Sequence, residues 1–92
     1  MSKKDFMKNQ IQTLVDFVNK KGNTMTFGEM ANISESINDI RLKLEDSEED
    51  FPNKDVVIAN LNDLKNTIRE TPYFNLISIL LGSLNRIMYF LK

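Results

Sequence analysis

The sequence predicts an all-α protein, a small four-helix bundle with a hydrophobic C-terminal helix at its centre. Apolar residues recur at spacings of three and four in four separate segments, which is typical of helices with one buried face. The chain shows neither sustained period-two alternation nor an Asn-Gly or Asp-Gly hairpin turn, so no strand is expected. Its 92 residues suit one helical domain covering 1–92.

The first helix is expected over about residues 3–21. Ser2 precedes it as a capping residue, and Asp5 stands three positions later, where its backbone N–H can be capped. Gly22 follows two lysines and can adopt the left-handed conformation that ends a helix. The apolar stripe that should face the core consists of Met7, Ile11, Leu14 and Val18.

The second helix, expected over about residues 27–45, has the strongest start signal in the chain. Thr26 and Glu29 fit a capping box, in which each side chain accepts a hydrogen bond from the other residue's backbone N–H. Met25 and Met30 stand where a hydrophobic staple would hold the entering chain. The narrow apolar stripe consists of Met30, Ile33, Ile37, Ile40 and Leu44.

The third helix is expected over about residues 54–70. Five carboxylates between Glu45 and Asp50 repel one another, and Pro52 disfavours helix in the residue before it, so the second helix should break here. Asn53 can cap the new helix. Its apolar stripe consists of Val57, Leu61, Leu64 and Ile68.

The fourth helix is expected over about residues 72–91 and begins at Pro72, a residue that is tolerated at the first helical position. The short connection predicts that the third and fourth helices pack as an antiparallel pair. Thirteen of the 21 residues from Pro72 to Lys92 are Tyr, Phe, Leu, Ile or Met. Arg86 would cost about 2.5–3.5 kcal/mol near the centre of a bilayer. We therefore expect a bundle helix and not a membrane span, with part of its surface covered by a second chain.

The composition excludes most catalytic chemistry. The chain has no Cys and no His, so it contains no disulfide, no thiolate and no histidine-activated nucleophile. Its three glycines are too far apart to form a phosphate-binding loop. We expect no enzyme activity and no cofactor.

The acidic run from Glu45 to Asp50 is the only segment that resembles a metal-binding loop. Its acidic residues alternate as the first ligands of a calcium loop would, but Phe51 and Val57 occupy the positions that need Gly and Glu. No metal site is expected. The run is either a solvated loop or a docking surface for a basic partner.

Charge is distributed unevenly along the chain. The net charge is −1, but residues 1–21 carry +3, residues 22–52 carry −6 and residues 53–92 carry +2. A dipolar surface of this kind steers partners and suits self-association. The basic residues are scattered and the sequence pI is about 5.3, so a nucleic-acid partner is not expected.

These patterns define three groups of candidate site residues. The candidate partner-binding residues are Glu45, Asp46, Glu48, Glu49 and Asp50. The candidate self-association residues, from the last helix, are Phe74, Ser78, Leu81, Gly82, Met88 and Leu91. The residues that could contact an anionic ligand are Asn85, Arg86 and Tyr89, because Arg and an aromatic ring suit a phosphate and a stacked base.

The function expected from the sequence is binding of another macromolecule, most simply a protein, by a cytoplasmic homodimer. Small regulators and inhibitors, such as phage or bacterial host-takeover and anti-defence factors, have this profile. Two alternatives stay open. One is a bundle of the bacteriocin-immunity type, which acts at the inner membrane face through peripheral contact. The other is a sponge that binds a small anionic ligand such as a nucleotide.

Overall fold

The computed structural model describes residues 2–71 and 73–91, apart from the side chains of Tyr73 and Phe74. It contains the helices α1 (Lys3–Lys21), α2 (Phe27–Asp46), α3 (Lys54–Glu70) and α4 (Tyr73–Phe90), with a short 3₁₀ turn, η1 (Gly22–Thr24), after α1. No strand occurs in these residues. The all-α class is therefore confirmed, and the predicted helix limits agree with the observed ones to within one residue. Pro72 lies outside the described residues.

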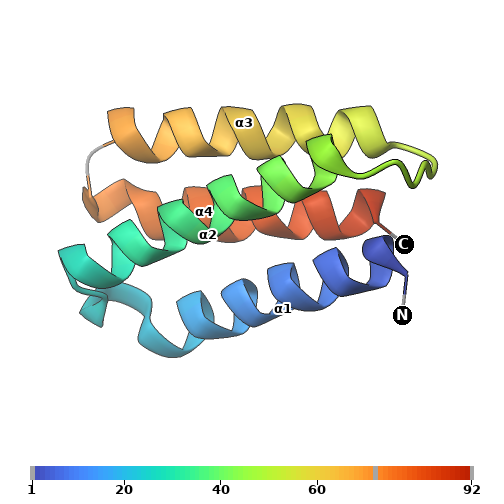
Figure 1. Cartoon of the computed structure of the whole chain (residues 1–92). Helices are drawn as coiled ribbons and strands as arrows, with labels where there is room; N and C mark the ends of the chain where they lie inside the picture. Colours follow the sequence, from blue (N-terminus) through green and yellow to red (C-terminus); the bar gives the residue numbers. More distant parts are fainter. Residues whose placement is uncertain (1, 72, 92) are drawn as a thin grey trace.

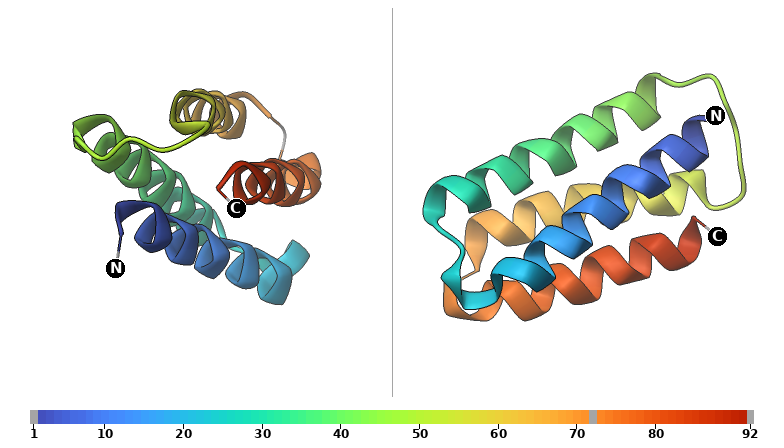
Figure 2. Two further views of the ribbon diagram at one scale, coloured as in Figure 1. Left: turned by 90° about the vertical axis from the view of Figure 1, so that its right-hand side faces the viewer. Right: turned by 90° about the horizontal axis from the view of Figure 1, so that it is seen from below.

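The helices form an up-down-up-down bundle in which each helix runs antiparallel to the next (Figure 1). α1 packs against α2 and α4, and α3 packs against the same two helices, so α2 and α4 lie diagonally opposite (Figure 2). α4 thus occupies one of four corners and not the axis of the bundle. Each helix of such a bundle can bury only the stripe that faces the axis, and even the most apolar helix keeps an outer face.

The core lies between the four helices and is entirely apolar. The predicted stripes supply it, except that Leu14 and Ile68 are only partly buried. No polar or charged side chain is buried among the described residues. The buried residues are Met7, Ile11, Val15, Val18, Met25, Met30, Ile33, Ile37, Ile40, Leu44, Val57, Leu61, Leu64, Leu76, Leu80, Leu84, Ile87 and Leu91.

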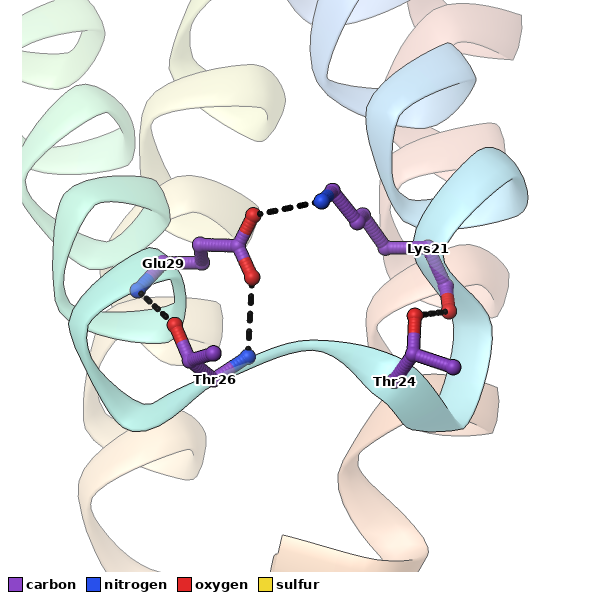
Figure 3. Close-up of polar contacts among 4 residues, drawn as sticks. All are labelled: Lys21, Thr24, Thr26 and Glu29. Carbon is purple, nitrogen blue, oxygen red and sulfur yellow. Dashed lines mark hydrogen bonds and ion pairs between the residues drawn. The ribbon is translucent and has the colours of Figure 1, made fainter.

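The turn between α1 and α2 is closed by the predicted capping box (Figure 3). Thr26 Oγ1 accepts a hydrogen bond of 3.1 Å from the backbone N–H of Glu29, and Glu29 Oε1 accepts one of 2.9 Å from the backbone N–H of Thr26. The other oxygen of Glu29 lies 3.2 Å from Lys21 Nζ. Gly22 ends α1 with a φ of +50°, a conformation that suits glycine. The turn is therefore fixed from both sides.

The start of α3 differs from the prediction that the side chain of Asn53 caps it. Asn53 adopts a left-handed conformation with φ +71°, and its side chain makes no cap hydrogen bond. Asn is one of the few residue types that tolerate this region. Lys54 Nζ instead organises the preceding loop, donating hydrogen bonds of 2.7 Å to the carbonyl oxygens of Ser47 and Glu49.

Candidate functional site

A hollow lies between α1 and α2. It consists of two adjoining cavities of about 350 Å³ and about 260 Å³, which share Thr13, Leu14 and Ser36 and so form one continuous groove. We call this the α1–α2 groove. The residues that line it are Gln10, Thr13, Leu14 and Phe17 from α1, and Glu29, Asn32, Ile33, Ser36, Asp39, Ile40 and Lys43 from α2.

The sequence creates the groove by placing small polar residues where the two helices face each other. Thr13 and Ser36 stand between the helices outside the core and fill little space, and α1 and α2 approach each other less closely than the other neighbouring pairs do. Leu14 and Phe17 are consequently only half-buried, although both pack against the core. The groove therefore has an apolar floor and polar walls, as ligand and helix-docking sites do.

Three polar groups shape one end of the groove. The Gln10 side chain is half-buried, but its Oε1 atom is enclosed and accepts no hydrogen bond in the described structure. Asp39 is exposed on the opposite wall. Lys43 Nζ lies 5.4 Å from the centroid of the Phe6 ring, a cation–π contact at the same end. A buried acceptor without a hydrogen-bond donor costs about 1–3 kcal/mol of stability.

At the other end of the groove, Glu29 has a structural role. The hydrogen bond from the Thr26 backbone N–H, with a further contribution from Lys21, lowers the pKa of Glu29 from its usual value. Both interactions belong to the helix cap and its ion pair. The lowered pKa therefore identifies a stabilised helix start and not a catalytic carboxylate.

Two of the five acidic residues between Glu45 and Asp50 interact with other residues of the same chain. Glu45 pairs with Arg41, whose Nη1 lies 3.0 Å from both carboxylate oxygens, and Glu49 accepts a 2.8 Å hydrogen bond from the backbone N–H of Lys3. The remaining acidic residues, Asp46, Glu48 and Asp50, are exposed. No group of three or more acidic side chains in the described part of the chain is arranged to hold a metal ion.

The candidate self-association residues, which lie in α4 or directly after it, differ in their burial. Ser78 and Gly82 are exposed, and Leu81 and Met88 are half-buried against the core. Leu91 is fully buried in the core, so its assignment to an outer contact is wrong. The physical reason is that Leu91 continues the inward stripe of Leu84 and Ile87. The side chain of Phe74 lies outside the described residues.

The candidate anionic-ligand residues share one helix face. Asn85, Arg86 and Tyr89 are all exposed on the outer side of α4, and none of them lines the α1–α2 groove. Tyr89 stacks edge-on against Phe90, with the ring centroids 5.7 Å apart. The structure thus brings the three residues together on one exposed helix face, separate from the α1–α2 groove.

Sequence reasoning missed the groove residues Gln10, Thr13 and Ser36. The available signal was the small polar residue beside the apolar stripe in each of the first two helices. That signal does not reveal which helices are neighbours, so the groove could not be assigned from it.

No described helix has both the length and the apolar character that crossing a bilayer requires. No protein family, characterised protein or solved structure matches this chain.

Proposed function

We propose that this chain acts by binding a protein partner, a helix of which lies in the α1–α2 groove, and that it catalyses no reaction. The observation that supports the proposal is the groove itself, where Leu14 and Phe17 stay partly accessible between two antiparallel helices. An amphipathic helix laid along the groove would cover this apolar floor, as in other helix-in-groove complexes. Binding without chemistry is how small regulators and inhibitors act.

The proposal of a non-catalytic role is supported by the composition. The full sequence has no His and no Cys, and the carboxylate with a lowered pKa, Glu29, is accounted for by its helix cap. The groove walls hold hydroxyl and amide groups and one residue of each charge at the Gln10 end, Asp39 and Lys43. Such a surface suits recognition of a partner more than it suits acid–base work.

The test fills the groove with a large side chain. Ser36 lines both cavities, so Ser36→Arg should obstruct the groove without touching the core. Asn66→Arg on the exposed face of α3 adds the same side chain far from the groove and serves as the control. Thermal unfolding followed by circular dichroism should show that both variants fold.

The readout is quantitative capture of proteins from a lysate of the organism that encodes the chain, followed by a binding measurement with the purified candidate. We expect a stoichiometric partner with the original chain and with Asn66→Arg, and loss of that partner with Ser36→Arg. Equal capture by all three chains would contradict the proposal, and so would an original chain that neither captures a partner nor associates with itself through the groove.

A further inference from the structure

The outer face of α4 is almost free of charge. Arg86 is the only charged residue between Tyr73 and Phe90, whereas each of the other helices carries several. The exposed residues of this face are Asn75, Ser78, Gly82, Asn85, Arg86 and Tyr89. Tyr89 leaves 66% of its surface exposed. Depletion of charge together with an exposed aromatic residue and an arginine is characteristic of the central part of a protein–protein interface.

Gly82 supplies a second observation on the same face. A Cβ atom placed on Gly82 would meet nothing within 4 Å, so packing inside the monomer does not require glycine there. Glycine within a helix costs about 0.8–1 kcal/mol relative to alanine. Ser78 stands one turn earlier on the same face and is also exposed. A helix of another molecule could approach α4 closely at Ser78 and Gly82.

The α1–α2 groove has the complementary character. Of its two acidic residues, Glu29 is already paired with Lys21, which leaves Asp39 as the exposed carboxylate on the wall. The amine of Lys43 lies over the Phe6 ring. A nearly uncharged helix face with a single arginine therefore matches a groove with an apolar floor and one available acidic side chain.

We infer that a second copy of this chain places the outer face of its α4 in the α1–α2 groove, with Arg86 of one copy beside Asp39 of the other. This inference rests on the proposed use of the groove as a helix-docking site and names one occupant for it. The two surfaces are different parts of the molecule, so the contact is heterologous, and repeated contacts give a ring or an open chain of copies.

The first experiment blocks each surface separately in the purified protein. Ser36→Arg obstructs the groove and leaves α4 unchanged, whereas Gly82→Arg obstructs α4 and leaves the groove unchanged. Analytical ultracentrifugation at high micromolar concentration should show association of the unmodified chain and monomers for each variant alone. An equal mixture of the two variants should form a discrete complex of one copy of each, because it contains one intact groove and one intact α4 face.

The second experiment exchanges the proposed charge pair. Asp39→Arg and Arg86→Asp should each weaken self-association about tenfold by placing like charges together, and the double variant should recover most of it. Asp63→Arg, an exposed change on α3, should leave association unaltered. All three positions are exposed, so circular dichroism should confirm that each variant folds.

Three results would overturn the inference. These are a monomeric unmodified chain at high micromolar concentration, persistent association of either blocked variant, or a mixture of blocked variants that does not form the paired complex. A monomeric chain that still captures a partner through the groove would reject the second copy as occupant and leave the proposed function intact. Self-association through both surfaces without any captured partner would support the inference. It would also contradict the idea that a different protein occupies the groove.

Discussion

The backbone N–H of Lys3 donates a 2.8 Å hydrogen bond to Oε2 of Glu49, a residue 46 positions further along the chain. The carboxylate therefore lies at the positive end of the α1 dipole and connects the α2–α3 loop to the start of α1. Lys4 Nζ lies 5.9 Å from the Phe51 ring in the same region. Glu49 thus stabilises the fold, and a test of the acidic run as a docking surface should change Glu48 and Asp50 and leave Glu49 in place.

The first prediction concerns this contact. Glu49→Ala should lower the free energy of unfolding by about 0.3–1 kcal/mol, because it removes a carboxylate from the N-terminus of α1. Glu48→Ala, a neighbouring exposed change, should have little effect. Urea unfolding followed by circular dichroism would measure both. The difference should shrink at about 1 M salt, where charges are strongly screened. Equal effects of the two substitutions would contradict the role of Glu49.

A second prediction compares one substitution at two helix positions. Thr26→Ala removes the N-cap of α2 and should cost about 0.5–2 kcal/mol of stability. Thr13→Ala lies inside α1, where Thr13 Oγ1 donates to the Asn9 carbonyl oxygen. Alanine is the better helix former there, so this change should be neutral or stabilise by roughly 0.5 kcal/mol. Chemical denaturation separates the cases, and a loss of similar size at both positions would argue against the cap.

The third prediction follows from the lowered pKa of Glu29. A carboxylate whose pKa is lower in the folded state stabilises the fold above its unfolded pKa, and this stabilisation is lost as the pH falls through the folded pKa. When the pH falls from neutral to below 4.5, the usual pKa of a glutamate, Glu29→Gln should therefore lose less stability than the unmodified chain. Urea unfolding at several pH values would show this. An identical pH dependence in both chains would contradict it.

The fourth prediction contrasts two glycines. Gly82→Ala should stabilise the dilute, monomeric protein by about 0.8–1 kcal/mol, because the position is exposed, helical and open. Gly22→Ala should destabilise it by roughly 1–3 kcal/mol, because Gly22 has a φ of +50°. Thermal or urea unfolding at low concentration measures both effects. If Gly82→Ala destabilised the protein even when dilute, the outer face of α4 would not be open in the monomer.

The helices themselves followed from the sequence because their causes are local. The Thr26–Glu29 capping box spans three residues, and each buried stripe repeats every three or four. The prediction for Asn53 was correct about the position, because Asn53 directly precedes α3. It was wrong about the interaction, because Asn53 adopts a left-handed backbone conformation and its side chain does not cap the helix. Leu91 shows a limit of a different kind, since a strongly apolar helix does not reveal which of its sides faces inward.

The sequence by itself determined the class of fold, the limits of the helices and the absence of histidine and cysteine chemistry. Tertiary structure alone decided that Glu49 accepts a hydrogen bond from the first turn of α1 and that α4 occupies a corner of the bundle. It also decided that Gln10, Thr13 and Ser36 line a groove. The physical reason is that these features depend on which helices become neighbours and how closely they approach. That outcome is set by the packing of all four buried stripes at once, and no single stretch of sequence contains it.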